Sequence, residues 1–279
     1  MHAHPLEAPH DPRLLQLFLQ HFGLRAGGDQ RELLREVATA FARLPYENLS
    51  KIVRLAERQS VTDSLRDPNE VITDHIALGT GGTCFSLTAT LLHLLRALGW
   101  RAEPILADRR YGANTHCALV VWIDDRPHLL DPGYLIVDPI PLETNREQRI
   151  VTSFNEIVLL PQAGGDKIDL LTRGNGQSTY RLTFKPQPVD AGEFLHVWKQ
   201  SFDWDMMHYP VLTRVAGDQQ LYLQGNKFQV RDHQSVERHE LPADELVARI
   251  TQTFGIDSTL TARALQLLKK DNTKTFPAT

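Results

Sequence analysis

The chain has 279 residues, of which 42% are hydrophobic and 23% charged, and its formal net charge is −4. This is ordinary globular composition, and the length permits one to three compact units. The acidic balance argues against nucleic acid as a partner, because such binders carry a strongly basic domain or stripe. No apolar run reaches the roughly 18 residues of a membrane span, and the beginning lacks the basic and apolar regions of a signal peptide. We therefore expect a cytoplasmic protein that binds neither nucleic acid nor membrane.

The first third of the chain predicts helices. Apolar residues recur at helical spacing in residues 14–22, and Asp29 is a candidate cap for a second helix. Residues 60–70 are polar and predict a loop. A strongly apolar helix follows Cys84, and Gly99 stands where its C-terminal cap belongs.

After Gly99 the apolar pattern changes to that of strands. Strands are expected at residues 101–107, 116–123, 128–130, 157–160, 168–171 and 180–184. Turn residues join the second to the third at Asp124-Asp125, and the last two at residues 173–176. The middle of the chain therefore predicts an antiparallel sheet or barrel. The last part mixes strands at residues 221–224 and 227–230 with helices from about Ala243 and Leu260.

Cys84 stands at the start of the apolar helix, behind a glycine-rich turn. A helix N-terminus carries partial positive charge and free amides, which stabilise a thiolate and lower the cysteine pKa. Gly81 and Gly82 permit a tight bend and the close approach of a substrate. Their amides, with that of Phe85, are candidates for holding a developing oxyanion. The pattern therefore predicts a nucleophile at Cys84.

Two other interpretations of this turn compete with a nucleophile. One is a buried structural cysteine next to a helix cap, which Thr83 would provide. The other is a phosphate-binding loop, but no Gly-Lys-Ser/Thr follows the glycines.

His116 and Asp131 lie on the two strands that the Asp124-Asp125 turn joins. If those two aspartates form the centre of the turn, opposed positions sum to 249, and His116 faces Gly133. Asp131 is two places from Gly133, so it projects from the same face, diagonal to His116, at about 7–8 Å between backbones. A carboxylate bonded to one ring nitrogen leaves the other nitrogen for a thiol. The alternative is a chance polar pair on a half-exposed strand.

The second cysteine serves as an internal comparison. Cys117 follows His116 on the same strand, so its side chain points to the opposite face. We expect a small, unreactive core residue there. Two cysteines make no disulfide framework, and in a reducing compartment both are free thiols.

Several short motifs resemble those of the arylamine N-acetyltransferases. Residues 81–85 are similar to the family's Arg-Gly-Gly-x-Cys-Phe/Trp-Glu motif, and residues 44–49 to its Pro-Phe-Glu-Asn-Leu element. Residues 115–116 resemble its Thr-His strand, and residues 131–134 its Asp-Val-Gly-Phe. Order and spacing agree over about residues 10–140, and residues 254–256 resemble a late Phe-Gly-Ile.

The resemblance implies an α+β fold in three parts with a cysteine-proteinase-like triad. Residues 1–99 would form a helical bundle that carries Cys84. Residues 100–188 would form a β-barrel that carries His116 and Asp131. Residues 189–279 would form an α/β lid.

The resemblance also implies a ping-pong acyl transfer. The Cys84 thiolate would attack the acyl group of acetyl-CoA or another acyl-CoA, with His116 moving the proton and Asp131 orienting His116. A small arylamine, hydrazine or hydroxylamine would then take the acyl group. The partners are thus small molecules, with acyl-CoA as cosubstrate and no metal.

Four residues depart from the family motifs. Thr80 replaces the arginine before the glycines, Ser86 the glutamate after the cysteine, Thr88 an asparagine, and Pro132 a valine. Arginine and glutamate so placed can pair across the turn, so their joint loss strands no charge. The changes bear on substrate and CoA use more than on thiol chemistry.

Two other features attract attention. His2, His4 and His10 lie near the beginning without a supporting cysteine or carboxylate cluster, so we expect no metal site. A group of aromatic and thioether side chains favours core or lid packing over lining of an acceptor pocket. This group is Trp198, Trp204, Met206, Met207 and Tyr209.

Three alternatives to an acyl-CoA-dependent transferase remain open. The first is an amide synthase of the same fold that accepts another thioester. The second is a thiol hydrolase, either peptidase or thioesterase, for which the triad is competent. The third is a non-catalytic descendant, for which Thr80, Ser86 and Thr88 are the only support.

Overall fold

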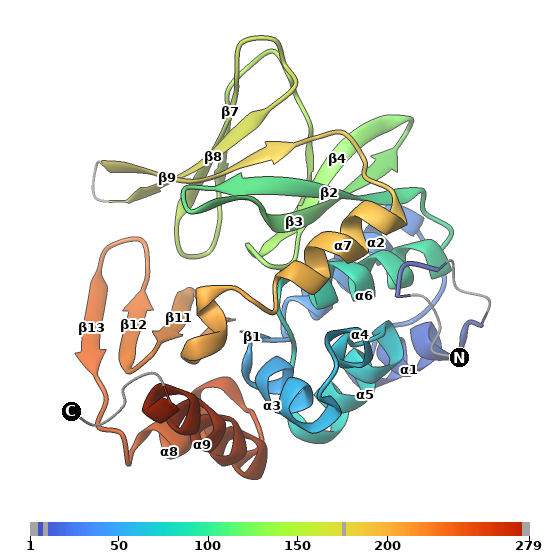
Figure 1. Cartoon of the computed structure of the whole chain (residues 1–279). Coiled ribbons are helices and arrows are strands. Elements are labelled where there is room, and N and C mark those ends of the chain that lie inside the picture. Colours follow the sequence, from blue (N-terminus) through green and yellow to red (C-terminus); the bar gives the residue numbers. More distant parts are fainter. Residues whose placement is uncertain (1–4, 8–10, 175–176, 275–279) are drawn as a thin grey trace.

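The computed structural model describes residues 5–7, 11–174 and 177–274, with side chains up to residue 270. Figure 1 shows a group of helices, a large curled sheet above them, and a smaller sheet with two helices beneath it. The histidines at positions 2, 4 and 10 lie outside the described residues. Within the described ranges, no group of three or more metal-ligating side chains occurs.

Six helices form the first group. They are α1 (Arg13–Phe22), α2 (Gln30–Phe41), α3 (Leu49–Arg58), α4 (Val61–Ser64), α5 (Pro68–Leu78) and α6 (Cys84–Ala97). The side chain of Asp29 caps α2 by accepting hydrogen bonds from two amides, as predicted. Thr83 is the N-cap residue of α6, but its side chain makes no capping bond. The predicted loop at residues 60–70 is wrong, because α4 and the start of α5 occupy it.

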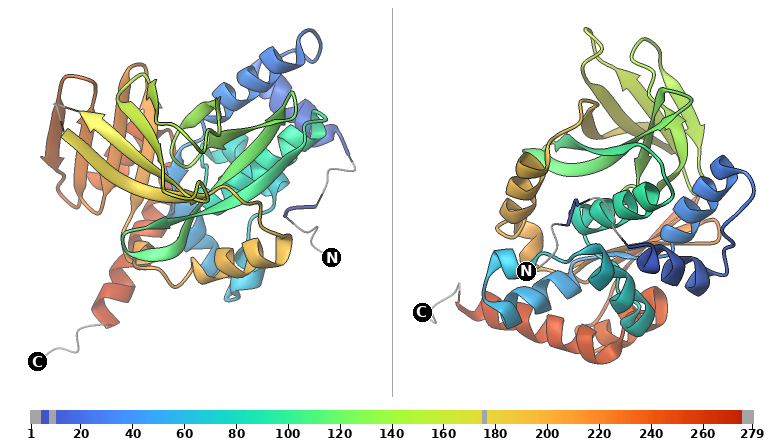
Figure 2. Two further views of the ribbon diagram at one scale, coloured as in Figure 1. Left: turned by 90° about the horizontal axis from the view of Figure 1, so that it is seen from above. Right: turned by 90° about the vertical axis from the view of Figure 1, so that its right-hand side faces the viewer.

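The large sheet has eight antiparallel strands in the order β5-β4-β3-β2-β9-β8-β7-β6. They are β2 (Ala102–Arg109), β3 (Gly112–Ile123), β4 (Arg126–Asp131), β5 (Ile136–Pro141), β6 (Gln148–Val151), β7 (Glu156–Pro161), β8 (Ile168–Gly174) and β9 (Gln177–Lys185). The sheet curls into a half-barrel, with β5 and β6 as its edges. Helix α6 packs beneath β2 and β3 (Figure 2).

The remaining elements form the smaller sheet, the helices next to it, and one helix, Ala191–Gln200, that packs against α6 through Phe194 and Phe85. They are β1 (Tyr46–Glu47), α7 (Ala191–Gln200), the 3₁₀ helix η1 (Asp205–His208), β10 (Val211–Ala216), β11 (Gln219–Gln224), β12 (Lys227–Arg231), β13 (Val236–Glu240), α8 (Leu246–Phe254) and α9 (Ser258–Lys274). The order in this sheet is β1-β10-β11-β12-β13. Strand β1 therefore leaves the helical segment and joins the last third of the chain. The α+β prediction is confirmed, while the division at residues 99 and 188 stays a prediction.

The two faces of β3 pack in two different hydrophobic clusters. Cys117, Leu119 and Val121 belong to a large cluster shared with the helices, whereas Ala118 and Val120 belong to a second cluster inside the curled sheet. Alternation along one strand thus separates the two cores. No helix among the described residues has the length and apolar content needed to cross a bilayer.

The predicted register of β3 against β4 is confirmed. Leu119 pairs with Leu130, and the pairing continues at the same sum of residue numbers to Ile123 and Arg126. The turn residues between them, Asp124 and Asp125, have φ angles of 51° and 57°. Two consecutive left-handed residues form the type of tight hairpin turn that matches the twist of the strands.

Candidate active site

The glycines before Cys84 let the turn pack against the segment that contains β1. A Cβ on Gly81 would lie 1.8 Å from the carbonyl oxygen of Pro45. The amide of Gly82 donates to the Pro45 oxygen at 3.3 Å, and the Gly82 oxygen accepts from the Glu47 amide at 2.9 Å. The expectation that the Gly82 amide holds an oxyanion is wrong, since Pro45 already uses that amide. Cys84 follows this turn as the first residue of α6, and the residue is only 2% exposed.

A buried arginine supports this turn from beneath. Arg66 is 4% exposed and donates to the Gly81 oxygen at 2.6 Å and to Ser50 Oγ at 2.9 Å. Its guanidinium lies 3.9 Å from the fully buried carboxylate of Glu47 and 3.4 Å from Thr80 Oγ1. The motif that this turn resembles has arginine at the position of Thr80. In this chain the guanidinium next to the turn belongs to Arg66, which lies outside the motif. Sequence reasoning missed it because it lies in the polar stretch taken for a loop.

His116 and Asp131 form a fully buried pair. His116 Nε2 lies 2.6 Å from Asp131 Oδ2, and the other oxygen of Asp131 accepts from the Tyr134 amide at 2.8 Å. A Cβ on Gly133 would lie 3.0 Å from His116 Cε1, 3.2 Å from Cys84 Cβ and 3.4 Å from Asp131 Oδ1. The structure therefore brings the three predicted site residues together around Gly133.

The electrostatics of this group favour a thiolate at Cys84. Its pKa lies well below the usual range, lowered first by a hydrogen bond from Cys117 and then by the bond and charge of His116 and the charge of Arg109. Burial of Cys84 opposes thiolate formation, but the hydrogen bonds and positive charges around the sulfur outweigh it. Burial also lowers the pKa of His116, but the charge and hydrogen bond of Asp131 raise it above its ordinary value. A cationic imidazole beside an anionic sulfur is the expected resting arrangement.

Arg109 lies next to Nδ1, the second ring nitrogen of His116. Its Nη2 lies 3.0 Å from His116 Nδ1, and its Nη1 donates to Tyr111 Oη at 2.7 Å. A guanidinium only donates, so this contact requires an unprotonated Nδ1. When Nδ1 carries the proton, this hydrogen bond is lost and the imidazolium itself is the cation beside the sulfur. The charges of His116 and Arg109 both lower the pKa of Cys84.

Cys117 lies on the opposite face of β3 from His116, as predicted, yet it is close to Cys84 because α6 passes over that face. It is fully buried, and its Sγ donates to Thr88 Oγ1 at 3.4 Å. Burial, followed by the influence of Cys84, raises the pKa of Cys117 well above its usual range. Nothing in the sequence pattern predicts that the sulfur atoms of Cys84 and Cys117 lie close together.

The lowered pKa of Cys84 predicts its reactivity toward iodoacetamide. The thiolate persists at pH values below the ordinary thiol pKa, and reactivity falls only when the pH drops through the lowered pKa. Between about pH 8 and pH 6 an ordinary thiol loses almost a hundredfold in rate, whereas we expect Cys84 to lose less than about threefold. Mass spectrometry of timed samples, with N-acetylcysteine in parallel, measures both rates. A steep fall at Cys84, or labelling of Cys117 first, would contradict the expectation.

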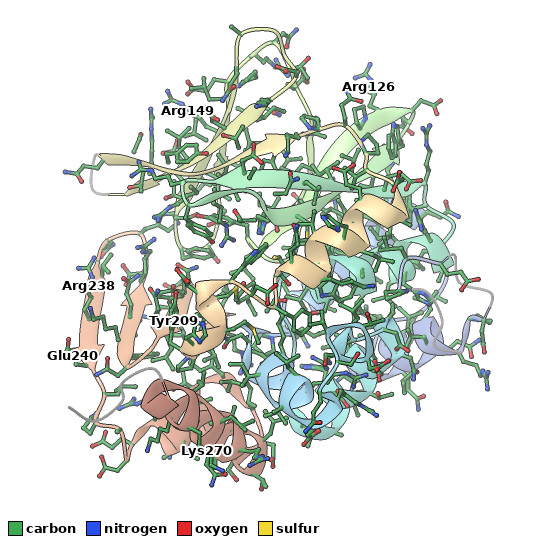
Figure 3. All side chains as sticks on the ribbon, in the orientation of Figure 1. Arg126, Arg149, Tyr209, Arg238, Glu240 and Lys270 are labelled. Carbon is green, nitrogen blue, oxygen red and sulfur yellow. The ribbon has the colours of Figure 1, made fainter. Side chains whose placement is uncertain are left out.

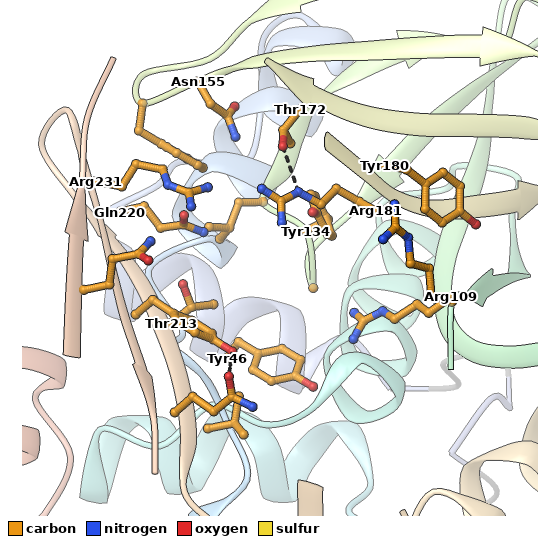
Figure 4. Close-up of a pocket in the computed structure, with 18 of the residues that line it drawn as sticks. Tyr46, Arg109, Tyr134, Asn155, Thr172, Tyr180, Arg181, Thr213, Gln220 and Arg231 are labelled. Atoms are coloured by element: carbon orange, nitrogen blue, oxygen red, sulfur yellow. Dashed lines mark hydrogen bonds between the residues drawn. The ribbon is translucent and has the colours of Figure 1, made fainter. Parts of the chain in front are cut away.

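A cavity of about 520 Å³ opens beside this group of residues. Gly133 and Arg109 line it, and both contact the predicted site residues. Figure 4 shows its two walls, with Tyr180 from the curled sheet and Tyr134 from the turn between β4 and β5 facing Thr213 and Gln220 from the smaller sheet. The cavity therefore ends next to Cys84.

The aromatic and thioether group does not line this cavity. Trp198 is 2% exposed and stacks on Phe85 at 6.3 Å between ring centroids, and Trp204 lies 5.9 Å from the same ring. Met207 is buried in the large core, and Trp204 and Met206 are partly buried and pack against it. Tyr209 is half-buried, and its carbonyl oxygen accepts from Asn48 Nδ2 at 2.8 Å. Core or lid packing, the role predicted for the group, is confirmed for the two tryptophans and the two methionines.

Comparisons with known proteins agree with this architecture. A family model described as N-acetyltransferase matches residues 31–263. The structure of the arylamine N-acetyltransferase from Mycobacterium abscessus superposes with a TM-score of 0.76 at 19% identity, covering 91% of this chain and 94% of that one. The arylamine N-acetyltransferase of Mycobacterium marinum gives a TM-score of 0.74 at 20% identity, covering 91% and 99%.

One curated relative matches a shorter stretch. Proansamycin X synthase of Amycolatopsis mediterranei (strain S699) is 27% identical over 128 residues, which are 43% of this chain and 48% of that protein. The match thus spans about half the length of that relative. The family model, by contrast, covers most of the chain. The chain therefore belongs to the arylamine N-acetyltransferase family and is an acetyltransferase.

Proposed function

We propose that this enzyme moves an acetyl or other acyl group from acyl-CoA to the nitrogen of a small arylamine or hydrazine, through a thioester on Cys84. The observation that carries the proposal is the buried 2.6 Å bond between His116 and Asp131, next to a cysteine whose pKa is lowered. A carboxylate that orients an imidazole beside a thiolate is the arrangement of cysteine acyl transfer.

The proposed reaction has two halves. The Cys84 sulfur attacks the thioester carbonyl, the bond to the CoA sulfur breaks, and His116 gives its proton to the departing CoA thiolate. The amine then attacks the acyl-Cys84 carbonyl, His116 takes a proton from the nitrogen, and the Cys84 thiolate leaves as the amide forms. Asp131 holds the His116 ring in place in both halves.

Burial supports transfer to an amine over hydrolysis. Cys84 is 2% exposed, and His116 and Asp131 are fully buried. An acyl group on Cys84 is therefore shielded from bulk water and waits for a nucleophile that enters through the cavity.

Intact mass spectrometry after mixing with acetyl-CoA tests the proposal. We expect an acetyl adduct on the wild type and on Cys117→Ala, and none on Cys84→Ala. Addition of an arylamine should remove the adduct and yield amide. An adduct that persists in Cys84→Ala would remove Cys84 from the mechanism, and free acid formed at the same rate with and without amine would indicate a hydrolase.

A second candidate is an amide synthase that takes its acyl group from a thioester other than CoA. The partial match to a synthase favours it, as does the replacement of motif residues by Thr80, Ser86 and Thr88. In the same assay, this candidate requires no adduct from acyl-CoAs but an adduct from an acyl N-acetylcysteamine thioester.

Gly133 is the position where added volume should disturb the chemistry most directly. In Gly133→Ala the new methyl would lie 3.0 Å from His116 Cε1 and 3.2 Å from Cys84 Cβ, so these groups must move by a few tenths of an ångström. We expect the Cys84 acylation rate to fall about tenfold, because attack depends on alignment. Stopped-flow kinetics measures it. Gly174→Ala, whose methyl would meet nothing within 4 Å, should acylate at the wild-type rate. Equal rates in all three proteins would contradict the assigned geometry.

A further inference from the structure

One wall of the cavity is the polar face of the smaller sheet. In β11 and β12, Gln220 pairs with Arg231 and Tyr222 pairs with Gln229, so these four side chains share one face. All four line the cavity. The alternate residues are apolar, and Leu223 and Phe228 among them are buried in the large core. The strict alternation along these strands therefore aims Arg231 into the cavity.

The opposite wall carries a second arginine, placed by an irregularity in the curled sheet. Leu171 pairs with Tyr180 but Leu170 pairs with Leu182, which leaves Arg181 as the extra residue of a β-bulge. Bulges re-aim side chains, and both Tyr180 and Arg181 line the cavity. Arg181 Nε donates to Thr172 Oγ1 at 2.7 Å, which fixes the base of the guanidinium. In Figure 4 the guanidinium groups of Arg181 and Arg231 are directed toward one another.

The charges of the cavity lining are all of one sign. Its lining includes Arg109, Arg110, Arg181 and Arg231 and, among the described residues, no aspartate, glutamate or lysine. Arg109 is held by His116 and Tyr111, and Arg110 lies over the ring of Tyr180. Within the described part of the chain, neither Arg181 nor Arg231 has a carboxylate oxygen within 4.0 Å.

Arg231 has one buried nitrogen that is left without a partner in the described part of the chain. Its Nε is buried and makes no hydrogen bond with the described residues. Burial first, and then the charge of Arg181, lowers its pKa. Two facing guanidiniums, one with an unsatisfied buried nitrogen, are unfavourable in the empty cavity. An anion between them would satisfy both, and the planar fork of each guanidinium matches a carboxylate.

We propose that the substrate which fills this cavity carries a carboxylate, bound between Arg181 and Arg231. The proposal rests on the proposed acyl transfer at Cys84 and adds the chemical class of the molecule that reaches it. The carboxylate belongs either to the amine acceptor or to the acyl group, since either can approach Cys84 through this cavity. Tyr134 and Tyr180 also line it and offer apolar faces to the remainder of the molecule.

A binding experiment tests the proposal without catalysis. Isothermal titration calorimetry would compare benzoate with benzamide, which has the same shape without the charge. We expect the wild type to bind benzoate at least about tenfold more tightly, and Arg181→Gln or Arg231→Gln to lose most of that preference while benzamide affinity stays unchanged. Arg238→Gln is the matched control, because Arg238 lies on β13 at the outer edge of the same sheet and outside this lining (Figure 3).

Two results would overturn the proposal. One is a wild type that binds benzoate no better than benzamide. The other is an equal loss of benzoate affinity in Arg181→Gln, Arg231→Gln and Arg238→Gln, which would indicate a diffuse field of positive charge. Circular dichroism and thermal melting of each variant identify any that fails to fold, and the wild-type comparison stands without the variants.

Kinetics then distinguishes the two sources of the carboxylate. If it belongs to the acceptor, Arg231→Gln should raise KM about tenfold or more for para-aminobenzoate and not for para-aminobenzamide. If it belongs to the acyl group, the rise should occur for succinyl-CoA and not for butyryl-CoA. An equal rise for both CoA esters would assign the arginines to the CoA phosphates and overturn the proposal. Failure of the proposed function would appear separately, as a wild type that forms no acyl adduct from any donor.

Discussion

Replacing Asp131 with asparagine should lower the rate of acyl transfer by about 10³- to 10⁴-fold while the chain stays folded. The asparagine oxygen can still accept from the Tyr134 amide, but its NH₂ group would donate to His116 Nε2. That nitrogen then accepts, the proton moves to Nδ1, and His116 can no longer take a proton from an attacking amine. Single-turnover acylation and steady-state transfer to an arylamine measure the two halves of the reaction.

The same substitution should raise the pKa of Cys84, because the imidazolium loses the carboxylate that stabilises it. The iodoacetamide profile of Asp131→Asn should therefore shift toward that of an ordinary thiol. Asp138→Asn is a suitable comparison, since Asp138 lies on β5 with its side chain 77% exposed in an ion pair with Arg35. A loss of less than about tenfold in Asp131→Asn would remove the orienting role of Asp131.

Replacing Arg66 with methionine should lower the free energy of unfolding by about 3–5 kcal/mol. The substitution leaves the fully buried Glu47 carboxylate without its cation and removes the bonds to Ser50 Oγ and the Gly81 oxygen. For a chain of this size the melting temperature should fall on the order of 10 °C. Differential scanning calorimetry measures it.

Two companion variants isolate the cause of the Arg66 effect. Arg66→Met combined with Glu47→Gln should recover part of the lost stability, because no buried charge then remains. Arg35→Met removes an exposed ion pair with Asp138 and should cost less than about 1 kcal/mol. If Arg66→Met melts like Arg35→Met, the buried network does not stabilise the turn.

The predictable part of this protein is what short stretches of sequence encode. The turn at Asp124 and Asp125 has residues that tolerate left-handed φ, and counting from it gave the register that brings His116 beside Asp131. Cys84 at a helix start could be recognised because the glycines, the cap position and the apolar stripe lie within a few residues of one another. Local signals of this kind need no knowledge of how distant segments pack.

The unpredicted part depends on segments that meet across the fold. In the sequence, nothing distinguishes Arg66 from a solvent-exposed arginine. Its role depends on the folded structure, in which it contacts the turn at Gly81 and the carboxylate of Glu47. Cys117 comes close to Cys84 only because α6 crosses β3, and periodicity within one strand does not contain that crossing.

The polar face of β11 and β12 is a different case. The sequence predicts strands at residues 221–224 and 227–230, and in the structure Gln220, Tyr222, Gln229 and Arg231 share one face of this pair. Only the facing wall that contains Arg181 shows that this surface closes over a cavity.

Strand β1 has a consequence for how the protein is made. Tyr46 pairs with Thr213 on one side and bridges to Gly82 on the other, so the turn before Cys84 rests on a segment that is itself anchored by the last third of the chain. While a ribosome is still translating that last third, β1 has no partner strand, and long-range pairing must wait for it. We therefore expect the segment that contains β1 to stay unpaired until β10 has emerged from the ribosome. A chain that is interrupted before β10 would lack the strand that anchors the support of the turn before Cys84.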